Sequence, residues 1–174
     1  MTSLKVFGTV LFLAFSVDLL GQINCDYKID TISILLNENL DSFVSKIQKK
    51  TFTISYDKKD IPPSLKVKLD CFANDFSIAN RDEEYQATCT IKKKLPERQL
   101  QFLGISDDTI IMTYLTGGVG VCTHILFVKL QGDTIKDLWA GTCLSELTSK
   151  KDILNYIKKN KNRQWGLQTN FVYI

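Results

Sequence analysis

Cys122 and His124 are the two residues of this 174-residue chain whose types and spacing come closest to a catalytic pair. Residues two apart on a β-strand share one face, and a cysteine nucleophile needs a base close to its sulfur. At the rise of an extended strand, however, the two Cβ atoms lie about 7 Å apart. No helix N-terminus precedes Cys122 to activate its thiol. A cysteine-dependent enzyme is therefore the least favoured of three functional hypotheses, and we favour a function without catalysis.

A disulfide would give the same thiol a structural role. If Gly132-Asp133 form a two-residue hairpin turn, Gln131 faces Thr134, and the same register places Cys122 opposite Cys143. The alternation of an antiparallel ladder makes this a non-hydrogen-bonded pair, whose Cα atoms are about 4.5 Å apart, within the range that a disulfide accepts. The sequence therefore predicts a Cys122–Cys143 bond.

The predicted hairpin also suggests a possible ligand pocket. Its register places Leu126 opposite Trp139 and His124 opposite Gly141, all on the face that carries the predicted disulfide. Because glycine has no side chain, the space above the imidazole would be open to a small ligand or to an aromatic neighbour.

Three further cysteines bring the total to five, so one thiol is left over if the others pair. Cys71 and Cys89 both lie on the apolar sides of alternating segments, and we expect a second disulfide between them. Cys25 would then be the odd thiol, either free or bonded to another chain. Other pairings remain open.

The first 21 residues have the pattern of an export signal. Lys5 precedes an apolar run from Val6 to Phe15, which is too short to span a bilayer, and Gly21 offers a small residue for cleavage. We therefore expect residues 1–21 to be a signal peptide and residues 22–174 to form a single secreted or periplasmic domain. No stable membrane span is expected after removal of this leader.

Charge and composition exclude several classes of function. Loss of the leader removes one cation and one anion, so the formal net charge of +3 is unchanged, which is too weak for nucleic-acid binding. A single histidine leaves a histidine-rich metal site without its parts. We predict neither a metal nor a cofactor. Lysine clusters at 92–94 and 158–163 are interpreted as solvated ends of elements.

Hydrophobic periodicity predicts the elements that position these residues. Apolar residues at helical spacing predict helices near 39–50 and 149–161, and Gly117-Gly118-Val119-Gly120 is interpreted as a turn rather than a phosphate-binding loop. Alternation predicts early strands in 51–56, 64–71 and 85–92, and a last strand in 165–174. Short turns predict a four-stranded antiparallel meander at 99–105, 109–116, 121–130 and 134–143.

Together these elements predict an α+β fold, mainly an antiparallel sheet packed with two helices. Their order resembles that of lipocalin-like barrels, although Phe52-Thr53-Ile54 stands where that family has its glycine-x-tryptophan signature. A cystatin-like curled sheet fits the same order. We therefore expect a non-catalytic binding or structural domain whose partner is an unknown protein or a small apolar ligand. The alternative is a carrier of a small apolar ligand, which is what the lipocalin-like resemblance implies.

Overall fold

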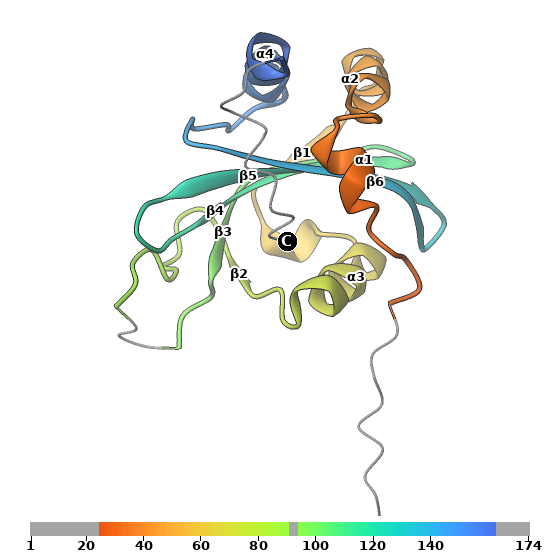
Figure 1. Cartoon of the computed structure of the whole chain (residues 1–174). Helices are drawn as coiled ribbons and strands as arrows, with labels where there is room; N and C mark the ends of the chain where they lie inside the picture. The colour runs from red at the N-terminus through yellow and green to blue at the C-terminus, as the bar shows by residue number, and fades with distance from the viewer. Residues whose placement is uncertain (1–24, 91–93, 163–174) are drawn as a thin grey trace, which may run out of the picture.

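The computed structural model describes residues 25–90 and 94–162, and Figure 1 shows their arrangement. The predicted leader and the predicted strand at 165–174 lie outside the described residues. The elements are the helices α1 (Thr31–Leu35), α2 (Leu40–Lys49), α3 (Pro63–Ala73) and α4 (Lys150–Asn160), the 3-10 turn η1 (Lys58–Asp60), and the strands β1 (Thr53–Ser55), β2 (Ile78–Ala79), β3 (Arg98–Ile105), β4 (Thr109–Thr116), β5 (Cys122–Gln131) and β6 (Thr134–Cys143).

The predicted four-stranded meander is confirmed as β3–β4–β5–β6. Along β3, the edge that faces away from β4 carries two short strands, with β1 antiparallel at one end and β2 parallel at the other. The resulting six-stranded sheet is open, as in a curled sheet, and does not close into a barrel within the described part of the chain. The fold is therefore α+β, as the sequence predicts, with more helices than expected.

Helices cover both faces of this sheet. On one face, Phe43 of α2 contacts Phe127 of β5 at 5.8 Å between ring centroids. On the other face, Phe76, which follows α3, contacts Tyr114 of β4 at 5.4 Å. Figure 1 accordingly shows α2 and α4 above the sheet and α3 below it. Burial on both faces explains why β5 has a continuous apolar run rather than an alternating one.

The two helices above the sheet begin and end close to the residues predicted. Leu40, Phe43 and Ile47 form the buried stripe of α2, and Ile153 and Ile157 form that of α4. The hydroxyl oxygen of Ser149 accepts a hydrogen bond from the backbone N–H of Asp152 at 3.1 Å, which caps the start of α4. Both predictions are confirmed.

The register of the β5–β6 hairpin differs from the predicted one. Gln131 faces Thr134 and Leu130 faces Ile135, as expected, but a bulge then shifts the pairing so that Lys129 faces Asp137. Since side chains alternate between the faces of a strand, a one-residue shift turns every later β6 side chain to the opposite face. Cys143 consequently lies opposite Thr123 rather than Cys122.

The segment predicted as a strand at 64–71 is part of helix α3. Leu65 and Leu69, four residues apart, are fully buried on one side of α3, whereas Val67 between them is 63% exposed. Pro63 stands in the first turn of the helix, where its missing N–H costs no hydrogen bond. Asn74 ends the helix in the left-handed conformation with φ 54°. The strand prediction was wrong because apolar residues at every second position also include apolar residues four positions apart, which is the spacing of one helical turn.

The segment predicted as a strand at 85–92 forms no regular strand in its described part, residues 85–90. Its one bridge joins Thr88 to Gly118, in the β4–β5 turn. A Cβ atom on Gly117 would lie 2.3 Å from the backbone of Gln86 and Ala87, so this close approach requires glycine. The interpretation of the glycine-rich stretch as a turn between two strands is confirmed.

Two asparagine side chains join the α1–α2 connection to β6, the last strand of the sheet. The amide of Asn39 donates to the backbone carbonyl of Leu138 at 3.0 Å, and the indole N–H of Trp139 donates to the side-chain carbonyl of Asn37 at 2.9 Å. These bonds fix the connection between α1 and α2 to the edge strand β6. None of the helices in the described segments has the length and apolar character that a membrane crossing requires.

Candidate functional site

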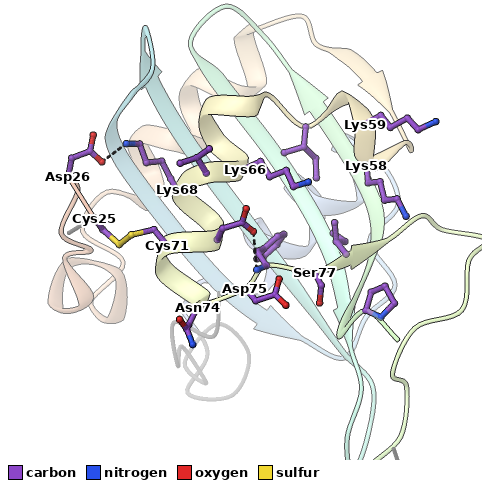
Figure 2. Close-up of a pocket in the computed structure, with 16 residues that line it drawn as sticks. Cys25, Asp26, Lys58, Lys59, Lys66, Lys68, Cys71, Asn74, Asp75 and Ser77 are labelled. Atoms are coloured by element: carbon purple, nitrogen blue, oxygen red, sulfur yellow. Dashed lines mark hydrogen bonds and ion pairs between the residues drawn. A yellow bond between two sulfur atoms is a disulfide. The ribbon is translucent and has the colours of Figure 1, made fainter. Parts of the chain in front are cut away.

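A groove of about 850 Å³ lies on the outer side of α3, on the sheet face opposite α2 and α4. Figure 2 shows its walls: α3 on one side, η1 and β2 on the other, and the loop after α3 between them. Small-molecule sites occupy roughly 300–1,000 Å³. The groove therefore has the size of a site for a small molecule or a short chain.

The groove has an apolar floor and a polar rim. Ile61, Phe76 and Ile78 are buried, with exposed fractions of 4%, 2% and 8%, and Val67 adds an exposed apolar surface from α3. Around this floor stand four lysines and three aspartates, namely Lys58, Lys59, Lys66, Lys68, Asp26, Asp70 and Asp75. Such a combination suits a ligand that has both an apolar body and a charged group.

Two of the four lysines are already paired. Lys58 forms an ion pair with Glu83 at 2.6 Å, and Lys68 forms one with Asp26. The side-chain hydrogen bond from Lys58 holds the pKa of the Glu83 carboxyl below its usual range, and that from Lys68 does the same for Asp26. The charges of these two lysines are therefore partly neutralised by their partners.

Lys59 and Lys66 differ from them, since neither ammonium group has an ion pair or hydrogen bond with any residue that the structure describes. Both side chains are exposed; Figure 2 shows Lys66 extending from α3 toward the opposite wall, whereas Lys59 extends from η1 away from α3, at the rim of the groove. The charge of Lys66 is therefore available to an anionic group held between the walls, and that of Lys59 adds positive charge at the rim.

A disulfide between Cys25 and Cys71 fastens the start of the described chain to α3 at one end of the groove. The Cα atoms are 5.9 Å apart, within the usual range for such a bond. The predicted Cys71–Cys89 pairing is therefore wrong, and Cys89 is an exposed thiol. The physical reason is that Cys71 lies on a helix, so the strand alternation that suggested Cys89 as its partner does not apply.

A hydrogen bond accepted by Asp70 supports the floor of the groove. The carboxylate accepts a hydrogen bond from the backbone N–H of Phe76 at 3.1 Å, across the turn at the end of α3. Within that turn both Asn74 and Asp75 have positive φ angles, of 54° and 127°. The turn brings the chain back along α3 and directs the Phe76 ring toward Tyr114 in the sheet.

The four residues predicted to form a ligand pocket are not brought together. His124 and Leu126 lie on the α3 face of the sheet, whereas Trp139 and Gly141 lie on the face covered by α2 and α4. The bulge separates them, because it turns the distal part of β6 over relative to β5. All four are buried, and none lines the groove beside α3.

His124 has a specific environment on the α3 face. Its ring stacks on Tyr114 with centroids 4.9 Å apart and an interplanar angle of 2°, and its Nε2 lies 2.8 Å from the hydroxyl of Thr116. Burial raises the pKa of Tyr114, and the guanidinium of Arg98, which also donates to it, acts in the opposite direction. Burial of the histidine and its contacts with Tyr114 and Thr116 suit a structural role in the core.

Cys122 and Cys143 are thiols in the structure, so the predicted disulfide between them is absent. The shifted register explains this, since Cys143 pairs with Thr123 and the two cysteines point toward opposite faces. Burial raises the pKa of the Cys143 thiol, partly countered by hydrogen bonds with the Ser145 backbone and the Tyr156 side chain. A raised pKa leaves less of the reactive thiolate at a given pH.

Alkylation of the native protein tests these cysteine assignments. We expect Cys89 to react first, since it is exposed, and Cys143 to react more slowly by a factor on the order of ten or more, since it is buried. Peptide mapping by mass spectrometry, with and without prior reduction, should find Cys25 and Cys71 labelled only after reduction. Recovery of a Cys122–Cys143 peptide from unreduced protein would contradict the shifted register.

The residues of the α3 groove were missed from the sequence because their helix was read as a strand. Pro63 and the Asn74-Asp75 pair were the available signals, as a helix start and a helix end.

Residues 25–90 and 94–162 contain no group of three or more histidine, cysteine, aspartate or glutamate side chains placed to hold a metal ion. Comparisons with protein-family models, curated proteins and solved structures find no significant match to this chain.

Proposed function

We propose that residues 22–174 form an exported, non-catalytic binding domain, and that its ligand is a small molecule with an apolar body and an anionic group. The apolar floor between Lys59 and Lys66 carries this proposal, because those two charges lack partners among the described residues. An aliphatic chain would cover Ile61, Phe76 and Ile78, and its carboxylate or phosphate would bind the Lys66 ammonium, with Lys59 adding attraction from the rim.

Export is supported by two independent features. The first 21 residues have the pattern of a cleaved leader. The described part contains a disulfide, which persists in oxidising compartments and is rare in the cytosol. Secretion or a periplasmic location is accordingly part of the proposal.

Ligand binding is tested by displacement of a fluorescent fatty acid from the purified oxidised protein. A saturated fatty acid should displace the probe, whereas the alcohol of the same chain length should do so about tenfold less well, since it lacks the charge. Reversal of both free lysines, Lys59→Glu with Lys66→Glu, should weaken fatty-acid binding by at least about tenfold.

The matched control is Lys136→Glu with Lys158→Glu, which changes the net charge equally at exposed sites outside the groove. This control should leave the affinity within about twofold, because both lysines stand on elements that do not line the groove and the attraction of exposed charges is screened by salt. Equal losses in both variants, or equal binding of acid and alcohol, would contradict the proposed site. A protein that binds no probe at all would instead favour a structural or protein-binding role.

A further inference from the structure

The two helices above the sheet form a layer with a strong excess of positive charge. Helix α2 with its C-cap Lys50, and helix α4 with its C-cap Lys161, contain eight lysines and two aspartates, which is a formal charge of +6. The remaining described residues contain ten lysines and arginines and sixteen carboxylates, which is −6. The small net charge of the whole chain therefore conceals a clear separation of charge between this layer and the rest. We call residues 40–50 and 150–161 the basic layer.

The helices of the basic layer lie side by side and antiparallel. Lys161, at the end of α4, forms an ion pair with Asp41, at the start of α2, at 2.5 Å. At the other end, the ammonium group of Lys150 donates to the backbone carbonyl of Lys50 at 2.6 Å. Two contacts at opposite ends hold the helices in one plane over the sheet, as Figure 1 shows. The layer therefore presents one broad face rather than a single stripe.

Five lysines of this layer are free to act on a partner. Lys50 is paired with Asp108 and Lys161 with Asp41, and Lys150 binds a carbonyl. The others have no ion pair or hydrogen bond with residues in the described ranges; they are Lys46, Lys49, Lys151, Lys158 and Lys159. Because the apolar stripes of both helices face the sheet, these lysines lie on the sides of the layer and on its outer surface.

Their distribution fits a planar partner. The antiparallel arrangement puts Lys46, Lys49 and Lys151 at one end of the layer and Lys158 and Lys159 at the other, and a ten-residue helix is about 15 Å long. The large exposed apolar side chains of the described residues all lie outside the layer. Contact would therefore be electrostatic and would not require insertion into the hydrocarbon.

We propose that the basic layer docks the protein on an anionic lipid surface. Lipid headgroups move laterally and can gather under both groups of lysines at once, and clustered lysines near such a surface each add to the attraction. The groove beside α3 lies on the opposite side of the sheet and would then face the aqueous phase. This inference does not depend on the proposed ligand, because it uses a different face and different residues.

Vesicle sedimentation tests the proposal with the oxidised protein lacking its leader. Phosphatidylcholine vesicles containing about one-third phosphatidylglycerol should bind the protein at about 0.1 M salt and release it at about 1 M salt, whereas pure phosphatidylcholine vesicles should not bind it. The variant Lys151→Glu, Lys158→Glu, Lys159→Glu should bind anionic vesicles at least about a hundredfold more weakly.

The matched control reverses three exposed lysines elsewhere, Lys28→Glu, Lys94→Glu and Lys136→Glu, and so has the same net charge. This control should retain most of the vesicle binding; an equal loss would show that net charge alone matters and would overturn the proposal. So would absence of binding to anionic vesicles. A soluble linear polyanion such as dextran sulfate is the third arm, and binding to it at a salt concentration that releases the vesicles would identify a polyanion site instead. Circular dichroism should show that both triple variants are folded.

Discussion

Replacing both Cys25 and Cys71 with serine is expected to lower the free energy of unfolding by about 4 kcal/mol, the chain-entropy value for a loop of this length. The bond joins residues 46 apart in the sequence, so its loss frees a long segment of the unfolded chain. It also releases the start of the described chain from α3, whose packing on the sheet forms the groove. Since native domains are stable by about 5–15 kcal/mol, this is a large part of the total.

Urea denaturation followed by circular dichroism measures this loss. Cys89→Ser is the control, because it removes an exposed thiol and should change stability by no more than about 0.5 kcal/mol. Reduction of the native protein should reproduce the loss without any substitution. If reduced and oxidised proteins unfold at the same urea concentration, the Cys25–Cys71 bond does not stabilise the fold.

Phe127→Ala is expected to destabilise the protein by about 3–5 kcal/mol. Phe127 is fully buried at the centre of the sheet, between Phe43 of α2 and Trp139 of β6, with ring centroids 5.8 and 5.2 Å away. Truncation would leave a cavity where three aromatic rings meet, and the surrounding helices and strands could fill it only in part. Chemical denaturation gives the magnitude, and near-ultraviolet circular dichroism reports the loss of aromatic packing.

Two further substitutions separate this effect from a general sensitivity of the sheet. Phe127→Leu keeps most of the volume and should cost about 1–1.5 kcal/mol. Val119→Ala, in the β4–β5 turn, removes a side chain that is fully exposed and should have an effect within about 0.5 kcal/mol. A small loss for Phe127→Ala would mean that this ring is not at the centre of the core, and would argue against the β5–β6 register, which pairs it with Trp139.

The central sheet could be predicted from the sequence because its signals are local. Each connection of the meander is short, and turn residues such as Gly132, with φ 58°, mark where the chain reverses. The stripes Leu40–Phe43–Ile47 and Ile153–Ile157 specify helices in the same way. In these segments, propensity and periodicity agree with the packing that the tertiary structure provides.

The pairing of β6 beyond its turn depends on information that no local pattern holds. Lys136 is the extra residue of the bulge, and it differs in no obvious way from any other polar residue of an exposed strand position. Its presence decides that Trp139 packs against Phe127 and bonds with Asn37, far away in the sequence. Long-range packing therefore selects the register, and the predicted Cys122–Cys143 bond fails with the assumption of a regular ladder.

Prediction of the candidate site from the sequence depended on one segment whose apolar residues fit both the strand period and the helix period. In residues 65–71 the apolar side chains alternate, yet Leu65 and Leu69 also stand one helical turn apart. If the segment were a strand, Lys66 and Lys68 would lie on the same solvent-facing side. On the helix they point in different directions: Lys68 forms an ion pair with Asp26, whereas Lys66 lies beside the apolar floor without an ion pair among the described residues. The groove could not be predicted without the helix, because its second wall is η1 and β2, which the chain brings opposite α3 only in the folded state.

The two edges of the sheet also affect whether this protein can associate with other copies at high concentration. A long unpaired strand edge is a template on which other chains can add and start fibrils. Here one edge is divided between β1, with three residues, and β2, with two, while on the other edge the Asn39 side-chain amide donates to one backbone carbonyl of β6, that of Leu138. The divided edge offers no long row of unpaired backbone groups, and the bond from Asn39 occupies a carbonyl on the other edge, so both features limit where a strand of another chain could add.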